Sequence, residues 1–396
     1  MLDVENFFNL GTEFFSFTNK KCKFDLEVET DINSALSQNT LVVSLLDEPI
    51  HYSFSSNKGL CTTTEFGSIK ESNLLGRLIS LPSNRAKPLL QFFEENGYLF
   101  NIGNTEPSRV DFKQLTQIIY RIKATIQLMT KLEDVTPEYD SILELTLFLL
   151  LSTPVSMQLS DKQVYNSYRN PIFTSLNSIN NSYGNNSDYT TIDGEDYYLV
   201  TDMIYPKEYK LRTDEYDDVS NGETFMYSYP GIADPLYKKL TIAYKNGIHI
   251  SKQQKLTIEF LFHFMHENGV IHNVTYDGGI QFYGDGALEL NDRMKKALII
   301  VARSTLSQEI NYNVSKIKAI YNPRTLAPTW KAPNLLTALY FSLFYMKPNS
   351  EIYRKCANPS CTNFFLVKTS NSRKIYCCNK CRNASNQRDY RFRQKK

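Results

Sequence analysis

Five of the seven cysteines lie close together near the C-terminus, in the stretch RKCANPSCTNFFLVKTSNSRKIYCCNKCRNA. They form a C-x4-C pair, a spacer of fifteen residues and a second group: Cys356, Cys361, Cys377, Cys378 and Cys381. Cysteines separated by a short spacer can both bind one ion, and Zn²⁺ takes four thiolates in a tetrahedron. The spacing therefore predicts a zinc site that is held by four of these five cysteines. Five thiols for four positions leave Cys378 as an alternative to Cys377.

The same stretch contains too few apolar residues to fold without help. Phe364 and Phe365 would supply a small core, and residues 370–372 would turn a hairpin between the two groups of cysteines. Structural zinc contributes on the order of 10–16 kcal/mol to the folding of such small units. Four thiolates leave no position for water or substrate, so the predicted metal is structural and not catalytic.

Basic residues surround and follow these cysteines. Residues 351–396 contain twelve Lys or Arg and two acids, a net charge of +10, while residues 1–350 contain 32 basic and 40 acidic residues, a net charge of −8. This asymmetry is typical of a protein that contacts a polyanion with one end. We expect a helix from about residue 382, in which Arg and Lys bind phosphates and Asn and Gln contact base edges. The candidate nucleic-acid-binding residues are Arg382, Asn383, Gln387, Arg388, Arg391, Arg393 and Lys395.

This C-terminal region resembles the CGNR-type, treble-clef-like zinc fingers of bacterial regulators. The resemblance rests on the knuckle, the aromatic pair, a polar turn, the second group of cysteines and the basic tail: Cys356-Ala357…Cys361, Phe364-Phe365, Ser370 to Arg373, Tyr376-Cys377-Cys378, Cys381, and the residues from Arg382 onward. The tetrapeptide that names the family is Cys381-Arg382-Asn383-Ala384 here, and the last spacer is one residue shorter than in the family. The helices expected over 288–346 are more weakly similar to the helical region that precedes the finger in that family.

The resemblance makes Cys377 a ligand together with Cys356, Cys361 and Cys381. It also implies a bacterial DNA-binding protein that regulates transcription, and the basic tail leaves RNA as an alternative partner. One short finger gives little specificity, so a homodimer or help from the body is expected. Two other function classes stay open: a protein–protein adaptor with a structural zinc module, and a nucleic-acid-related enzyme whose active site lies unrecognised in residues 1–350.

No enzyme motif supports the last alternative. His263 and His266 lie three residues apart, but Phe262 and Phe264 beside them are typical of a packed core, and the HExxH order is absent. The acidic stretch DEYDD (214–218) has no His or metal-ligand spacing and is expected to be a solvated loop. The N-terminus lacks the basic residues of a secretory signal, and the densest apolar run, 143–151, is too short to cross a bilayer. These features predict a cytoplasmic protein without a membrane partner.

The elements that position the finger are predicted to form an α+β protein with a predominantly helical body. We expect a mixed α/β N-terminal domain (1–166), an Asn/Ser-rich and acidic linker or excursion (167–235), a helical domain with a hairpin (236–350), and the zinc finger with its basic helix (351–396). Within the body, apolar periodicity and capping residues predict strands at 22–30 and 41–46, and helices ending at Asn96 and beginning after Ser108. Further along they predict a helix over 251–269, a hairpin over 270–284, helices over 288–320 and 335–346, and a Pro-rich joint over 322–334.

Overall fold

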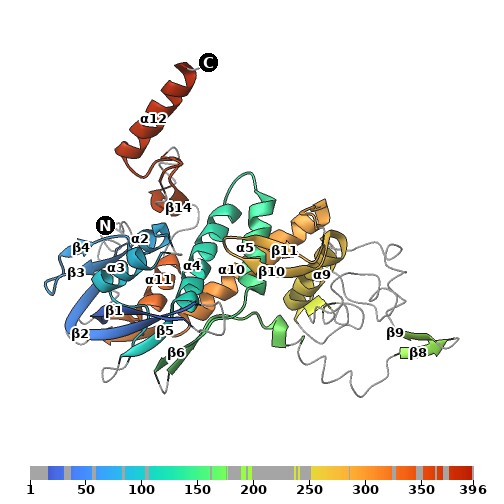
Figure 1. Ribbon diagram of the computed structural model, residues 1–396, viewed down its shortest axis with the longest axis horizontal. Helices are drawn as coiled ribbons and strands as arrows, with labels where there is room; N and C mark the ends of the chain where they lie inside the picture. Colours follow the sequence, from blue (N-terminus) through green and yellow to red (C-terminus); the bar gives the residue numbers. More distant parts are fainter. Residues whose placement is uncertain are drawn as a thin grey trace, which may run out of the picture. The chain divides into compact units, whose positions relative to one another are not determined.

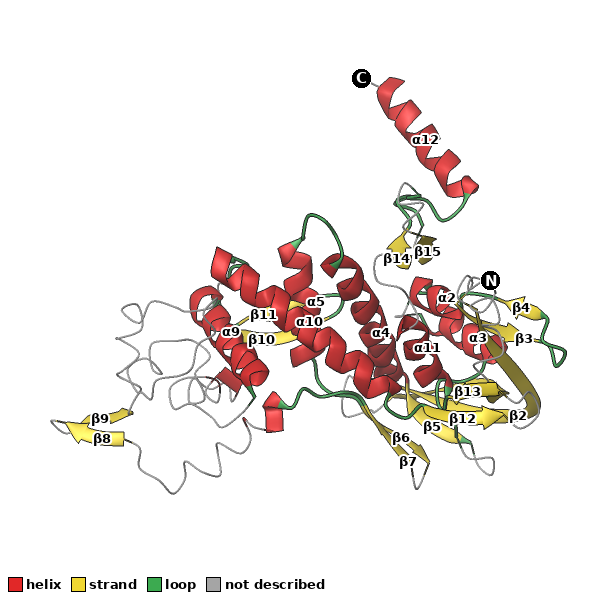
Figure 2. Ribbon diagram, turned by 180° about the vertical axis from the view of Figure 1, so that it is seen from behind, coloured by secondary structure: helices red, strands yellow, loops and turns green. Residues whose placement is uncertain are grey.

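The structure is a computed structural model. It describes residues 17–30, 37–55, 59–82, 85–102, 107–160, 163–174, 176, 189–192, 195–198, 236–237, 240, 251–284, 286–322, 327–344, 351–361, 364–368 and 374–394. Helices and strands both contribute substantially, as predicted (Figures 1 and 2).

The chain divides into two compact units, and each is built from separate segments. Unit 1 contains Met1–Glu133, Pro154–Tyr168 and Ile310–Lys396, and unit 2 contains Asp134–Thr153 and Arg169–Glu309. This division differs from the sequence-based boundaries, because the cysteine-rich region belongs to the same unit as the N-terminal sheet.

Unit 1 is organised around an antiparallel five-stranded sheet. Its strands are β1 (Thr18–Thr30), β2 (Ser37–Ser55), β3 (Gly59–Thr63), β4 (Ile69–Glu71) and β5 (Ser108–Asp111), in the order β1-β2-β3-β4 with β5 paired to β2. Side chains alternate between the two faces of a strand, so the fully buried Leu41 and Val43 on β2 point into the core. Both predicted strands are confirmed, although Leu26, expected on the buried face of β1, is 46% exposed.

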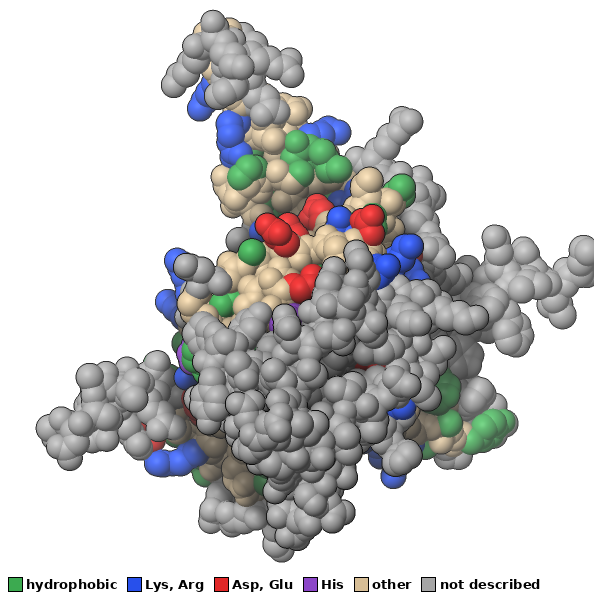
Figure 3. Space-filling view, turned by 90° about the vertical axis from the view of Figure 1, so that its right-hand side faces the viewer, with side chains coloured by type: hydrophobic (Ala, Val, Ile, Leu, Met, Phe, Trp, Pro, Cys, Tyr) green, Lys and Arg blue, Asp and Glu red, His purple; other side chains and the backbone are tan. Residues whose placement is uncertain are grey.

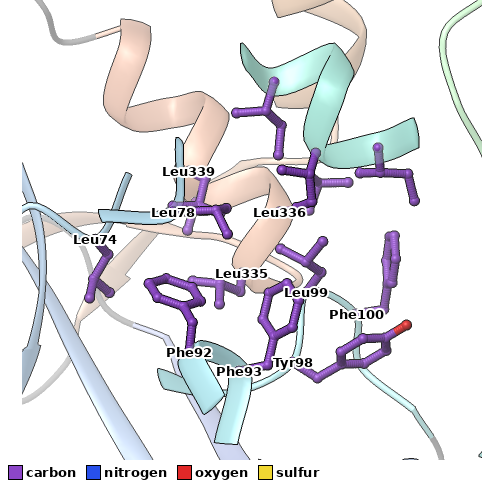
Figure 4. Close-up of a cluster of buried hydrophobic side chains, with 14 of the residues drawn as sticks. Leu74, Leu78, Phe92, Phe93, Tyr98, Leu99, Phe100, Leu335, Leu336 and Leu339 are labelled. Atoms are coloured by element: carbon purple, nitrogen blue, oxygen red, sulfur yellow. The ribbon is translucent and has the colours of Figure 1, made fainter. Parts of the chain in front are cut away.

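Four helices complete the core of unit 1 (Figure 1). They are α2 (Leu74–Ser80), α3 (Ala86–Asn96), α4 (Phe112–Leu132) and α11 (Leu335–Phe344). Figure 4 shows how side chains distant in sequence meet there: Leu74, Leu78, Phe92, Phe93, Tyr98, Leu99, Leu335, Leu336 and Leu339. The backbone N–H of Leu336 also donates to the carbonyl of Leu99 at 3.0 Å. Helix α11, late in the sequence, is therefore an integral part of this core.

The predicted ends of these helices are mostly correct. Helix α3 ends at Asn96, and Gly97 follows with φ 84°, a value that glycine adopts easily. Helix α4 begins differently from the prediction, because Ser108 lies in β5 and its hydroxyl donates to the carbonyl of Leu159. Asp111 caps α4 instead, accepting from the backbone N–H of Lys113.

Two further hairpins belong to unit 1. They are β6 (Ser156–Ser160) with β7 (Gln163–Asn166), and β12 (Lys318–Asn322) with β13 (Ala327–Lys331). The Pro-rich joint predicted over 322–334 contains β13, and the helix predicted over 288–320 is too long at its C-terminal end, because residues 318–320 belong to β12. Pro328 is tolerated in β13 because the two-stranded hairpin leaves one edge unpaired.

The described residues of unit 2 include three helices and a hairpin. These are α5 (Tyr139–Leu151), α9 (Lys252–Asn268), the hairpin β10 (Ile271–Thr275) with β11 (Gly279–Phe282), and most of α10 (Asp292–Val314). Ser251 and Gln254 form the predicted capping box at the start of α9, and Gly279, φ 65°, ends the hairpin turn. None of the described helices is both long enough and apolar enough to span a membrane.

The described part of the predicted linker is small. It includes a hairpin, β8 (Tyr189–Ile192) with β9 (Glu195–Tyr198), whereas the acidic stretch 214–218 lies outside the described residues.

Of the two histidines of α9, His263 lies in the core and His266 is partly buried. His263 is fully buried, and the ring of His266 stacks on Phe262 with centroids 5.7 Å apart. Burial lowers the pKa of His263 well below its usual value and that of His266 to about 4, so both are neutral at physiological pH. They join no cluster of metal-ligating side chains among the described residues.

Candidate metal centre

The cysteine-rich region of unit 1 consists of a hairpin followed by a helix. Strands β14 (Glu351–Lys355) and β15 (Phe364–Lys368) pair antiparallel, and helix α12 spans Asn379–Gln394. Cys356 directly follows β14 and Cys361 precedes β15, so the first pair of cysteines lies at the turn of the hairpin. Cys377 precedes α12 and Cys381 lies in its first turn. The hairpin that the structure describes here is β14–β15, which flanks the first group of cysteines. The turn expected at 370–372, between the two groups, lies outside the described residues.

Four sulfur atoms converge between these elements. The Sγ atoms of Cys356, Cys361, Cys377 and Cys381 all lie within 4.8 Å of one another. The sulfur of Cys377 is 3.7 Å from that of Cys361 and 3.5 Å from that of Cys381. A tetrahedron with metal–sulfur bonds of 2.3 Å has sulfur–sulfur edges of about 3.8 Å. The four sulfurs could therefore bind one metal ion.

Cys378 lies outside this group of four. Its side chain is exposed, and its sulfur is 3.8 Å from that of its neighbour Cys377. The set that can surround one ion thus contains Cys377, the ligand favoured by the sequence, and the alternative residue Cys378 is left at the surface.

The electrostatics of the four thiols also fit a cation. Burial opposes ionisation of Cys356, but the backbone N–H groups of Cys377 and Asn358 hold the pKa of Cys356 below its usual value. The Cys377 N–H lies 3.4 Å from this sulfur. Burial and the neighbouring thiols raise the pKa of Cys377. Several thiolates cannot crowd together without a positive charge, and a divalent ion would supply it.

The hairpin has a small core of its own, and it also makes two hydrogen bonds to α2 and the residue that caps it. Phe365 and Val367 are buried beside Cys356, and the ammonium group of Lys374 lies 5.3 Å from the centre of the Phe365 ring. On the other side, the hydroxyl of Tyr353 donates to Asn73 Oδ1 at 2.6 Å. The backbone N–H of Phe364 donates to Ser80 Oγ at 2.7 Å, at the opposite end of α2.

Arg388 attaches helix α12 to the first pair of cysteines. Its Nη2 donates to Asn358 Oδ1 at 3.1 Å and to Ser360 Oγ at 3.0 Å, and both acceptors lie between Cys356 and Cys361. Ser385, one turn earlier, is buried. The sequence assigned Arg388 to nucleic acid, but the structure shows its guanidinium holding the helix to the hairpin. Arg388 is therefore a positioning residue in this structure.

Other predicted nucleic-acid-binding residues do face solvent. Arg382, Asn383, Gln387 and Arg391 are exposed on α12, whereas the side chain of Arg393 and all of Lys395 lie outside the described residues. Figure 3 shows Lys and Arg side chains on this C-terminal segment. Helix α12 begins three residues before the predicted start, so that Cys381 is part of it.

The sequence interpretation did not name Asn386, which lies on α12. It is exposed and borders a depression of about 780 Å³ beside the second cysteine group. Lys374, Asn379 and Arg382 also line this depression. The signal was available in the sequence, since residue 386 lies three positions after Asn383 and thus near it on a helix.

Comparisons of the chain with protein-family models, with curated proteins and with solved structures find no match.

Proposed function

We propose that the four cysteines hold a structural Zn²⁺ in a treble-clef-like finger. Four thiolates in a tetrahedral arrangement are a typical donor set for structural zinc. A catalytic ion would need an open ligand position, and the four sulfurs surround the site without one. The small core around Phe365 supports the same conclusion, because a unit of this size needs a metal to be stable.

We further propose that the finger binds duplex DNA and that the protein regulates transcription. One observation carries this proposal: Cys377 and Cys381 lie at the N-terminal end of α12, so an ion bound there fixes the helix that carries the exposed Arg382 and Arg391. A metal-anchored helix with exposed cations suits the major groove, where helices of other fingers bind. The +10 charge of residues 351–396 provides the attraction to phosphates.

Titration of a fluorescent random-sequence duplex over a series of salt concentrations tests this function. With about four to five phosphate contacts, log K is expected to fall against log salt with a slope near −4. Replacing both arginines (Arg382→Gln, Arg391→Gln) should weaken binding and make the slope shallower by about 2. The exposed Arg85→Gln, in the body of unit 1, is the matched control and should change neither quantity. A wild-type slope near zero, or no binding at low salt, would refute the proposal.

A further inference from the structure

We propose that α12 reads adenine bases in the major groove through three neighbouring amide side chains. These are Asn383, Asn386 and Gln387, which we call the amide stripe. The inference rests on the proposed DNA-binding function and adds to it the class of base pair that the finger selects.

The amide stripe faces away from the side of α12 that is attached to the finger. Cys381, Ser385 and Arg388 contact the hairpin or are buried against it, and at about 100° per residue they share one face of the helix. Asn383 and Asn386 lie on the opposite face, and Gln387 lies next to them. The three amides therefore point outward when the helix is held by its anchor.

No hydrogen bond or ion pair joins the side chains of the amide stripe to any other described residue. Asn383, Asn386 and Gln387 are all exposed, whereas Arg388 next to them makes two hydrogen bonds inside the finger. Their amide groups can therefore donate and accept at the same time toward a ligand. An amide presents a donor and an acceptor side by side.

The donor and the acceptor of an amide side chain match the groups that adenine presents in the major groove. Adenine offers N7 as an acceptor and the N6 amino group as a donor in the major groove, and Asn or Gln binds both. Guanine offers two acceptors there and is typically read by Arg or Lys. The centre of the stripe has amides and no cation among the described side chains, so the chemistry favours adenine.

Two cationic side chains of α12 lie on the two sides of the amide stripe, where they would face the phosphates of bound DNA. Arg382 is next to Asn386 on one side of the stripe, and Arg391 is next to Gln387 on the other side. Lys374, beside the same depression as Arg382 and Asn386, extends the first of these borders. A central amide stripe between two cationic borders fits a helix whose middle faces the bases and whose sides face the two DNA backbones. Double-stranded RNA fits less well, because its major groove is too narrow for side chains to read.

Selection from a pool of duplexes with a randomised centre, using the full chain loaded with zinc, provides the first test. We expect the enriched duplexes to share adenine at two or three neighbouring positions. Each of these adenines is then replaced by 7-deazaadenine, which keeps the Watson–Crick pair but lacks the N7 acceptor. Affinity is expected to fall about five- to a hundred-fold at a position that is read.

Variants separate base reading from phosphate binding. Asn386→Ala and Gln387→Ala should each lower affinity for the enriched duplex and remove its sensitivity to 7-deazaadenine at one position, with the salt slope unchanged. Arg391→Gln is the matched control on the same helix. It should weaken binding to all duplexes similarly and make the salt slope shallower by about 1.

The outcomes distinguish failure of the base readout from failure of DNA binding. Equal, salt-dependent binding to every duplex, or enrichment that 7-deazaadenine does not affect, would refute adenine reading and leave DNA binding intact. Binding to no duplex, or a preference for RNA, would remove both proposals.

Discussion

Glu259 is an acidic residue in an apolar environment. Its side chain in α9 is fully buried, and neither carboxylate oxygen has a hydrogen-bond partner among the described residues. Burial raises its pKa to about 8, although Lys255 one turn away acts in the opposite direction. The folded protein therefore keeps Glu259 protonated at neutral pH, because an uncompensated buried charge is costly.

This burial predicts how stability depends on pH. Between the ordinary value of 4.5 and about 8, Glu259 is ionised in the unfolded chain and protonated in the folded chain, so raising the pH through this window lowers stability. Glu259→Gln should remove that loss. We expect its free energy of unfolding to match that of the wild type near pH 4.5 and to exceed it increasingly up to pH 8, by on the order of 4 kcal/mol.

The measurement is thermal unfolding of both proteins across this pH range. Glu289→Gln, an exposed carboxylate in the same unit, is the control and should leave the profile unchanged. A constant difference between Glu259→Gln and the wild type at all pH values would contradict the buried, protonated state.

The cysteines allow a matched pair of variants. Cys361 belongs to the group of four sulfurs, whereas Cys378 is exposed beside it. Cys361→Ser should lose the bound metal, since it removes one of four thiolates, and Cys378→Ser should keep one ion per chain. Elemental analysis and native mass spectrometry measure zinc content directly. Zinc loss in Cys378→Ser alone would show that the ligand set is assigned wrongly.

At the scale of elements, α2 contacts the hairpin that carries the first pair of cysteines through the residue that caps its N-terminus. Asn73 adopts the left-handed conformation, φ 57°, and its Oδ1 accepts both from the backbone N–H of Gly76 at 3.1 Å and from Tyr353 at 2.6 Å. One side chain thus begins the helix and binds the hairpin that carries the cysteines.

Two substitutions at this position separate its roles. Asn73→Ala loses the cap, the contact with Tyr353 and the tolerance of a left-handed backbone, and should cost about 2–3 kcal/mol. Asn73→Gly keeps the backbone freedom and should be about 1 kcal/mol less harmful. Thermal unfolding compares them, with Tyr353→Phe reporting the hydrogen bond alone. Equal losses in the alanine and glycine variants would mean that the left-handed conformation contributes nothing.

The elements that the sequence predicted well are those with local signals. Helix capping depends on only a few neighbouring residues. Examples are the capping box of Ser251 and Gln254 and the glycine that follows α3. The hairpin β12–β13 was missed because its prolines resemble a joint, and its strands are identified only by their pairing. The two contacts of Arg388 were missed for a similar reason, since its acceptors lie about thirty residues earlier. In the metal centre, ligand spacing indicated that four of the five cysteines bind one ion, while the choice between Cys377 and Cys378 needed three-dimensional positions.

At the scale of the whole molecule, composition predicted the charge division but not the units. Unit 1 consists of three segments that unit 2 separates along the chain. Boundaries predicted from changes in composition follow the chain linearly, so they assign the N-terminal sheet and the cysteine-rich region to different domains. The structure joins them through long-range contacts such as Thr130 Oγ1 to the carbonyl of Tyr353, 3.1 Å.

The position of α11 in the core has a consequence for biosynthesis. Leu335, Leu336 and Leu339 pack against side chains from residues 74–100, yet they leave the ribosome more than two hundred residues later. At about 5–20 residues per second, the core around residues 74–100 stays incomplete for on the order of ten seconds or more. During that interval its apolar side chains are available to chaperones. A nascent chain interrupted before residue 335 is expected to remain insoluble or to be degraded, however well its own strands have formed.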